Sequence, residues 1–313
     1  MPHPDEPLPP IPPVVTDGAF TMQDGLRLPY REWLPPGEPA IVVLALHGID
    51  DSRDAWEVPG PALAAQGIAV IAPDERGFGA TLDRGIWPGT EQMLTDTRAM
   101  ALDLRARYPQ ARLYLMGESM GSAVLLALAA SPEAPPVDGY VFSSPAVWGR
   151  REMNSLYRSF LWIADHTAPN VALTGHGAGV TPTDNDAAWE RLSRDPLTLT
   201  ETRISTVKGL VDLMDAALAG AGHVKIPALF LYGGHDELVP RNAMAAAWRA
   251  ALASGNRRLA FAYYPKGYHL LQRDHEGPVV TADIAHWLRD PTAPLPSGAE
   301  ARAARWLASQ PAP

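Results

Sequence analysis

Short apolar runs alternate with amphipathic stretches along most of the chain, from residue 20 to residue 288. The run AIVVLALHG at residues 40–48 is almost continuously apolar, as expected of a central parallel strand that is covered on both faces. Similar runs recur as IAVIAPD, ARLYLMG, GYVFSSP, PALFLYGG and RLAFAYYP. Because helical patterns separate these strands, the chain predicts right-handed crossovers and an α/β fold, with a mostly parallel central sheet flanked by helices.

Three further segments extend this pattern. Residues 26–33, LRLPYREW, alternate like an antiparallel strand, and the proline within them places that strand near an edge of the sheet. Residues 90–108 carry apolar side chains at helical spacing and end before Pro109, which predicts a helix. Residues 119–130 are small and apolar on all sides, as in a helix buried against a sheet.

The alternation of strands and helices stops for residues 146–224, where aromatic side chains are frequent and strand patterns are few. Both flanks return to one sheet, so we expect a helical cap inserted after the sixth strand, above the carboxyl ends of the strands where such sheets bind ligands. The other expected parts are a proline-rich N-terminal tether at 1–19, the two parts of the core at 20–145 and 225–290, and a tail with a short helix at 291–313.

The composition excludes several classes of function. The 26 basic and 35 acidic side chains give a net charge of −9, so no positive field would recruit nucleic acid. The absence of cysteine excludes disulfides, thiolate metal sites and a cysteine nucleophile. No apolar run approaches the roughly 20 residues that span a bilayer, so no transmembrane span is expected.

The proline-rich start leaves the compartment open. Its first 13 residues lack the basic start and apolar core of a signal peptide. They are either an untouched cytoplasmic start or the remainder of an export or lipid-anchor segment, in which case the protein is periplasmic or tethered to a membrane. Transient or lipid-anchored membrane association is therefore retained as an expectation, and the oligomeric state is left open.

The stretch GESMGSA, residues 117–123, is the first candidate for chemistry. A strand, a G-x-S-x-G turn and a helix follow one another here, and the glycines permit a turn too tight for other side chains. On such a turn Ser119 projects as a nucleophile, and the N–H of Met120 at the helix start is placed to stabilise an oxyanion. The alternative is a glycine-rich turn without chemistry.

A serine nucleophile needs a base and a carboxylate that orients the base. In this fold the acid follows the serine along the chain, and the histidine follows the acid. Asp236 lies just past the strand PALFLYGG, and His269 lies past the next strand, so both join the turn at the carboxyl ends of the sheet. The rivals considered for these two roles are His235, His275, His286 and Glu237, while Asp212 and Asp215 are expected to be solvated.

A second oxyanion donor is expected in the loop after the strand at residues 40–48. The N–H of Ile49 would point into the site from the stretch LALHGIDDS. His47 is expected to have a structural role, bonded to nearby backbone. Asp50 and Asp51 either border the pocket mouth or cap their own loop, and the second role is favoured.

The stretches HGIDDS, DERGFGAT, GESMGSA, GGHDELVP and GYHLLQRD, in this order, resemble the monoacylglycerol lipase or lysophospholipase branch of the α/β-hydrolases, a group that is also serine aminopeptidase-like. The resemblance covers roughly residues 20–288. It implies a triad of Ser119, Asp236 and His269, with oxyanion N–H groups from Ile49 and Met120. It also implies a small-molecule acyl ester substrate, and neither a cofactor nor a metal.

The family's cap forms an apolar tunnel for the acyl chain. By resemblance, candidates for its wall are Leu156, Phe160, Trp162, Leu210 and Met214, each of which could equally be core of the cap. Two departures bear on substrate size. Ser122 stands where relatives often have glycine, which narrows helix packing near the nucleophile, and Ile49 replaces an aromatic residue beside the oxyanion site.

Three functions compete at this point. A serine carboxylester hydrolase that forms an acyl-enzyme on Ser119 fits the complete triad order and the apolar cap. An amidase or peptidase would use the same triad, with Asp50 and Asp51 as the only hint of a site for a substrate amino group. A non-catalytic binding protein on this fold is the least favoured, because such proteins usually lose a triad residue.

Overall fold

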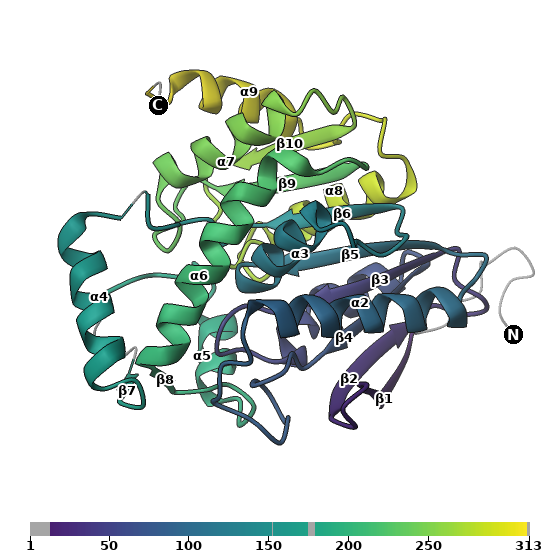
Figure 1. Cartoon of the computed structure of the whole chain (residues 1–313). Coiled ribbons are helices and arrows are strands. Elements are labelled where there is room, and N and C mark those ends of the chain that lie inside the picture. Colours follow the sequence, from purple (N-terminus) through teal and green to yellow (C-terminus); the bar gives the residue numbers. More distant parts are fainter. Residues whose placement is uncertain (1–12, 152, 175–178, 312–313) are drawn as a thin grey trace, which may run out of the picture.

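The computed structural model describes residues 13–151, 153–174 and 179–311. At its centre is an eight-stranded sheet in the order β1-β2-β4-β3-β5-β6-β9-β10 (Figure 1). The strands are β1 (Val14–Thr21), β2 (Arg27–Leu34), β3 (Ile41–Leu46), β4 (Ile68–Pro73), β5 (Arg112–Glu118), β6 (Gly139–Ser143), β9 (Ala228–Gly233) and β10 (Leu259–Tyr264). Only β1 and β2 run antiparallel to their neighbours, which confirms the mostly parallel sheet.

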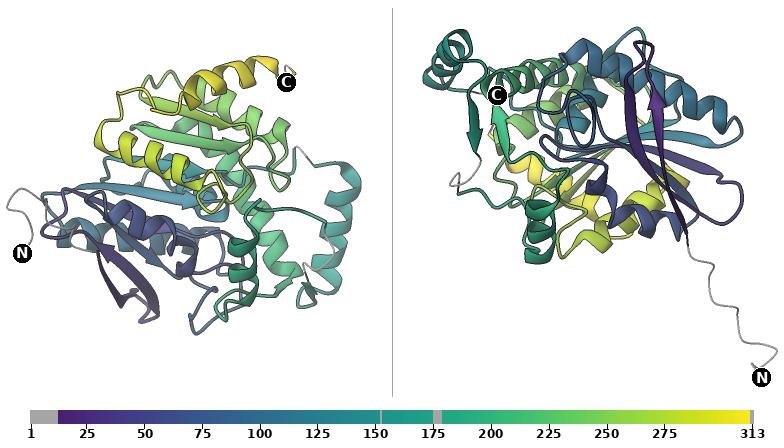
Figure 2. Two further views of the ribbon diagram at one scale, coloured as in Figure 1. Left: turned by 180° about the vertical axis from the view of Figure 1, so that it is seen from behind. Right: turned by 90° about the horizontal axis from the view of Figure 1, so that it is seen from below.

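Helices cover both faces of this sheet (Figures 1 and 2). One face carries α2 (Thr90–Arg107), α3 (Met120–Ala130), α6 (Ile204–Gly220) and α7 (Arg241–Ala253), and the other carries α1 (Pro59–Ala64) and α8 (Gly277–Arg289). Strand β3 shows why its sequence is continuously apolar: Val42 and Leu44 enter one core, while Ile41 and Val43 enter the other.

The N-terminal region differs from expectation. Residues 14–19, assigned to the tether, belong to β1, which pairs with β2 along its whole length from Val14↔Leu34 to Thr21↔Arg27. Residues 1–12 lie outside the described residues. The strand expected near an edge is β2, the second strand of the sheet, because β1 takes the edge position.

The cap follows the sixth strand, as predicted, and lies beside the carboxyl ends of the sheet (Figure 1). It comprises α4 (Ser155–Thr167), β7 (Ala172–Thr174), α5 (Asp186–Arg194), β8 (Glu201–Arg203) and α6. Few strand patterns were expected here, yet β7 and β8 form a small antiparallel sheet. Helices α4 and α5 bury no residue, whereas α6 buries an apolar face against α3, so α6 joins the cap to the core.

The tail ends in the expected short helix, α9 (Ala299–Ser309), which packs on the edge strand β10. Trp306 of this helix stacks on Tyr263 and meets Trp248 edge-on, with ring centroids 5.2 and 4.9 Å apart. Two short 3-10 helices, η1 (Arg53–Trp56) and η2 (Ala221–His223), complete the fold. In the described part of the chain, no helix has the length and apolarity to cross a bilayer.

Candidate active site

The turn between β5 and α3, residues 117–121, is the nucleophile loop. Ser119 sits on it with φ 52° and ψ −111°, a left-handed conformation that costs free energy for a residue other than glycine. A Cβ on Gly117 would lie 2.4 Å from the backbone N of Ser122, and one on Gly121 would lie 2.5 Å from the carbonyl O of Leu46. Both glycines are therefore needed to pack this turn tightly against α3 and β3.

Ser122 is a buried packing residue. Its hydroxyl donates to the Gly117 carbonyl at 2.6 Å and lies 3.2 Å from the Ser143 carbonyl, and it has no exposed surface. It joins α3 to the ends of β5 and β6, so it affects how the helix packs against the sheet near the nucleophile.

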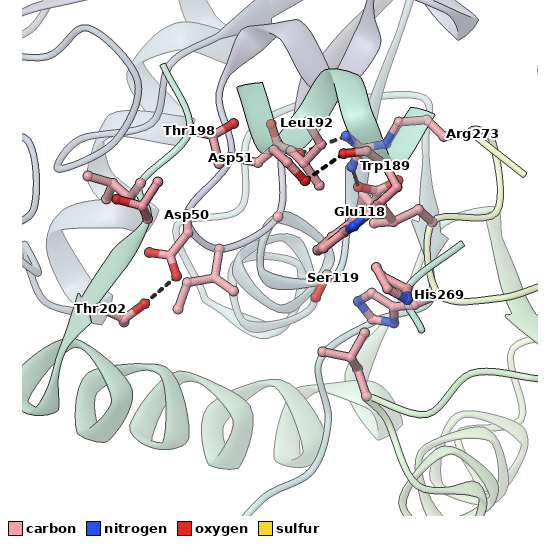
Figure 3. A pocket seen from close by; sticks show the side chains of 18 residues that line it. Asp50, Asp51, Glu118, Ser119, Trp189, Leu192, Thr198, Thr202, His269 and Arg273 are labelled. Atoms are coloured by element: carbon pink, nitrogen blue, oxygen red, sulfur yellow. Dashed lines mark hydrogen bonds and ion pairs between the residues drawn. The ribbon is translucent and has the colours of Figure 1, made fainter. Parts of the chain in front are cut away.

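His269 and Asp236 meet across the ends of β9 and β10. The Nδ1 atom of His269 lies 2.9 Å from Oδ2 of Asp236, and Oδ1 of Asp236 accepts the N–H groups of Leu238 and Val239 at 2.9 Å. Both carboxylate oxygens therefore have partners, and the imidazole is held with its other nitrogen on the side of Ser119 (Figure 3).

The charge state of His269 reflects this pairing. Burial alone lowers the pKa of His269, but the negative charge of Asp236 and the hydrogen bond to it outweigh burial and raise the pKa above its usual value. A histidine with this environment accepts a proton readily and holds it beside the carboxylate.

The loop after β3, residues 47–52, is the oxyanion loop, and it runs directly beside the nucleophile. A Cβ on Gly48 would lie 3.5 Å from the Ser119 Cβ, and the Gly121 N–H donates to the His47 carbonyl at 3.0 Å. Ile49 follows Gly48 and lines the same cavity as Ser119, while Met120 begins α3, whose first N–H groups have no acceptor within the helix.

His47 has the structural role expected of it. Its Nδ1 lies 2.7 Å from the Gly48 carbonyl, and its Nε2 accepts the Glu75 N–H at 3.0 Å. Burial lowers the pKa of His47, which keeps the ring neutral as these two bonds require. The ring fixes the oxyanion loop and does not reach the cavity.

A cavity of about 310 Å³ lies between these loops and the cap (Figure 3). Ser119 and His269 lie on its core side. Its cap side is formed by Pro182, Trp189, Leu192, Ser193, Thr198, Leu199, Thr200 and Thr202. Among the described residues, no group of three or more histidine or acidic side chains could hold a metal ion.

Asp50 connects the core to the cap. It has φ 61°, its carbonyl accepts the Leu199 N–H at 2.7 Å, and its carboxylate accepts the Thr202 hydroxyl. Burial raises the pKa of Asp50 to about 6. Capping of its own loop, the role favoured from the sequence, is therefore not the whole role of Asp50, because Asp50 also lines the cavity and bonds to the helical cap.

Asp51 belongs to a second buried group of charges. Its Oδ2 lies 2.8 Å from Nη1 of Arg273, and Nη2 of Arg273 contacts Oε1 of Glu118. All three side chains line the cavity, on the side of His269 that faces the oxyanion loop (Figure 3). Neither Glu118 nor Arg273 was predicted from the sequence. The only signals were an acid inside G-x-S-x-G and a basic residue four positions after the histidine.

The rival residues lie elsewhere. His235 is exposed and stacks on Tyr268, His275 is exposed, and the Glu237 carboxylate accepts the Thr181 N–H of the cap at 2.8 Å. His286 lies within α8 on the other face of the sheet. The cavity lining in the described chain includes none of the four.

None of the five candidates for the tunnel wall lines the cavity, and two of them have the core position that was the other role considered for them. Leu156, Phe160 and Trp162 of α4 are more than 60% exposed and lie outside the cavity lining, and Leu210 and Met214 pack in the core beneath α6. The wall comes instead from α5 and the segment 198–202. Asp212 and Asp215 are ion-paired with Arg150 rather than simply solvated.

Comparison with known proteins identifies the family of the chain. Residues 37–276 match the family described as Serine aminopeptidase, S33. A monoacylglycerol lipase of Mycolicibacterium smegmatis is 21% identical over 274 residues, which cover 87% of this chain and 96% of that protein. A monoglyceride lipase of Rattus norvegicus is 23% identical over 273 residues, which cover 84% of this chain and 86% of that protein.

Solved structures share the fold. A soluble variant of monoglyceride lipase from Saccharomyces cerevisiae, in complex with a substrate analog, superposes with a TM-score of 0.74 at 18% identity and covers 94% of this chain and 100% of its own. A monoacylglycerol lipase of Paleococcus ferrophilus gives 0.69 at 21% identity, covering 85% and 99%. The chain therefore belongs to the serine aminopeptidase S33 family of α/β-hydrolases and is a serine hydrolase.

Proposed function

We propose that this enzyme hydrolyses acyl esters of lipid-like alcohols, of the monoacylglycerol or lysophospholipid class, through an acyl-enzyme on Ser119. The observation that carries the proposal is a serine on a strained turn that lines the same cavity as His269, whose imidazole is paired with buried Asp236. The names of the lipase relatives support the substrate class.

The mechanism follows from the positions of these groups. The Oγ atom of Ser119 attacks the ester carbonyl carbon while Nε2 of His269 takes its proton. The carbonyl oxygen becomes an oxyanion that the N–H groups of Ile49 and Met120 stabilise, each worth about 10²- to 10³-fold in rate. His269 then gives the proton to the leaving alcohol oxygen, and the acyl group remains on Ser119.

Water completes the cycle. His269 takes a proton from the water as its oxygen attacks the acyl carbon, and the proton returns to Oγ of Ser119 when the carboxylic acid leaves. Asp236 orients the imidazole throughout, because its Oδ1 accepts two backbone N–H groups while Oδ2 faces Nδ1 of His269.

The cavity supports an acyl chain of modest length. Apolar side chains from both walls surround Ser119, and a volume of about 310 Å³ lies at the low end of the range of about 300 to 1,000 Å³ for ligand pockets. We therefore expect the activity to peak at short to medium acyl chains in a series of otherwise identical esters.

The test combines labelling with turnover. Wild type should react with a fluorophosphonate and hydrolyse a series of p-nitrophenyl acyl esters, whereas Ser119→Ala should lose both. The matched control is Ser254→Ala, at an exposed position beyond the end of α7, where the hydroxyl bonds to the backbone of Ala251 and Asn256. Turnover by Ser119→Ala at the wild-type rate would overturn the proposal. Monoacylglycerols and lysophospholipids assayed in parallel then identify the head group.

The second candidate, an amidase or peptidase, is less well supported by the acidic residues. Asp51 is already ion-paired with Arg273, and the Asp50 carboxylate already accepts the Thr202 hydroxyl. A substrate ammonium group would therefore meet no free pair of carboxylates. Aminoacyl naphthylamides assayed against acyl esters separate the two reactions, and faster amide cleavage would reverse this preference.

We also propose that the cap contacts lipid surfaces through α4. This helix buries no residue, and Leu156, Phe160 and Ile163 on it are 77%, 68% and 53% exposed. Large exposed apolar groups on one element are typical of membrane-contacting surfaces. Phe160→Ser should weaken sedimentation with phosphatidylcholine vesicles, while the control Leu252→Ser, at an exposed apolar position on α7, should not.

A further inference from the structure

Among the described residues that line the cavity, Arg273 is the one arginine or lysine, and the proposed mechanism does not use it. It is 6% exposed, and its two carboxylate partners, Asp51 and Glu118, are 4% and 2% exposed. Nη1 of Arg273 lies 2.8 Å from Oδ2 of Asp51, and Nη2 contacts Oε1 of Glu118. Charges this far from water are costly, so a role in stability alone is a weak explanation for them.

The three residues belong to three different catalytic loops. Glu118 directly precedes Ser119 in the nucleophile loop, and Asp51 follows Ile49 by two positions in the oxyanion loop. Arg273 itself lies in the loop after β10, residues 265–274, which we call the histidine loop because it carries His269. One guanidinium therefore connects every loop that supplies an attacking, proton-transferring or oxyanion-binding group.

The shape of the guanidinium matters for this connection. Its N–H donors lie in one rigid plane, so two carboxylates bound to different nitrogens are fixed in both distance and direction. A lysine ammonium carries the same charge but no planar fork. The oxyanion loop also receives a direct bond from the nucleophile loop, from the Gly121 N–H to the His47 carbonyl, whereas the histidine loop is joined to both through Arg273.

The group also acts on the imidazole. The charged side chains that face His269 are Asp236 from the end of β9, Glu118 from the end of β5, and Arg273 from its own loop. Glu118 favours the imidazolium and Arg273 opposes it. Burial raises the pKa of Glu118, and the charge of Arg273 and its hydrogen bond to Glu118 offset part of that rise.

We propose that Arg273 is a positioning residue, whose two ion pairs hold the nucleophile, oxyanion and histidine loops in the arrangement that ester hydrolysis needs. The proposal rests on the proposed function at Ser119. Misplacement of reacting groups by about 1 Å costs on the order of 10²-fold in rate. Loss of the fork should therefore lower kcat and leave KM, which reports the more distant acyl and head-group contacts, nearly unchanged.

Two variants separate geometry from charge. Arg273→Lys keeps the charge and loses the fork, so kcat for a p-nitrophenyl ester should fall about 10²-fold while the acid limb of the pH profile stays in place. Glu118→Gln keeps an acceptor oxygen and removes the charge beside His269. Its acid limb should move to lower pH by about one unit, because the imidazolium loses a stabilising anion.

The matched control is Arg76→Lys. Arg76 forms an equally buried fork with Asp96, through Nε at 2.6 Å and Nη2 at 3.0 Å, but it lies outside the cavity lining. It should lower the melting temperature and leave kcat and the pH profile unchanged. Circular dichroism on all variants distinguishes a folded, slow enzyme from an unfolded one.

The outcomes are distinct. If Arg273→Lys is folded and as fast as wild type, or if Arg76→Lys slows the enzyme equally, Arg273 has no positioning role. If the acid limb of Glu118→Gln stays where it is in wild type, Glu118 has no electrostatic effect on His269. Should either variant fail to fold, the Asp51→Asn, Glu118→Gln and Arg273→Met triple variant, which leaves none of the three buried side chains charged, replaces it and should show the same fall in kcat. A wild type without esterase activity would instead overturn the proposed function.

Discussion

The two walls of the cavity are held in different ways. On the core side, Ser119, Asp236 and His269 lie at the carboxyl ends of β5, β9 and β10 of one sheet, and each is at most 9% exposed. On the cap side, α4 and α5 bury no residue, and Trp189 in the wall is 49% exposed. The groups proposed for chemistry are thus fixed by the sheet, while those that would select the substrate lie on a lightly packed layer.

This contrast separates two kinds of substitution. A change on the core side alters the position or protonation of a reacting group, so it should affect every substrate equally. A change on the cap side alters contacts with the acyl chain, so it should affect long esters more than short ones. Substitutions on each side of the cavity should therefore have effects that can be told apart.

The strongest test on the core side is Asp236→Asn. The amide oxygen can still accept the Leu238 and Val239 N–H groups, but the side chain no longer stabilises an imidazolium. We expect kcat to fall about 10⁴-fold for acetyl and octanoyl p-nitrophenyl esters alike. Stopped assays with both esters measure this. A loss confined to one chain length would contradict the assignment of Asp236.

On the cap side, Trp189→Ala should change selectivity rather than chemistry. Removing this wall residue should lower kcat/KM for the octanoyl ester about 10- to 100-fold and change the acetyl ester little. Trp162→Ala is the control, because Trp162 of α4 is similarly exposed at 62% and lies outside the cavity lining. If Trp189→Ala lowers kcat/KM equally for both esters, the two walls do not have the separate roles described.

The pH profile reports the core side in the wild type. His269 must be neutral to take the Ser119 proton, and its pKa is raised, chiefly because Asp236 outweighs the effect of burial. Activity should therefore be full above that pKa and fall about tenfold for each pH unit below it. A plot of kcat/KM against pH gives the midpoint, which we expect above the ordinary histidine value. A midpoint below that value would contradict the pairing described.

Asp50→Asn, at the contact between the core and the cap, should have the smallest effect, a change in melting temperature. The pKa of Asp50 is raised to about 6 by burial, so its ionised form destabilises the fold above pH 6, and this penalty disappears as the pH falls toward 4. Asparagine tolerates the left-handed backbone and can accept the Thr202 hydroxyl. The melting temperature should rise by a few degrees at pH 8 and not at pH 4.

The catalytic strands were predictable because their signals are local. Continuous apolar runs such as β3 indicate burial on both faces, and the glycines around Ser119 indicate a tight turn within five residues. The sequence order of acid and histidine then placed Asp236 and His269 at neighbouring strand ends. Each of these features can be predicted from neighbouring residues, without knowing which distant residues it contacts.

The features that sequence reasoning missed all depend on distant partners. Strand β1 carries Asp17 and Gly18, and only its pairing with β2 makes it a strand. The spacing of apolar residues on α4 shows that Phe160 lies on an apolar side, but not whether that side faces the cavity or the solvent. Arg273 and Glu118 are 155 positions apart, so neither residue indicates the other.

The position of β10 at the end of the sheet has a consequence for how activity is acquired. β10 is an edge strand, it carries the histidine loop at its end, and α9 at the C-terminal end of the chain packs on it. A chain still emerging from the ribosome thus already contains Ser119 but lacks its base. Return of turnover during refolding should accordingly report the docking of this last strand, later than signals from the sheet interior.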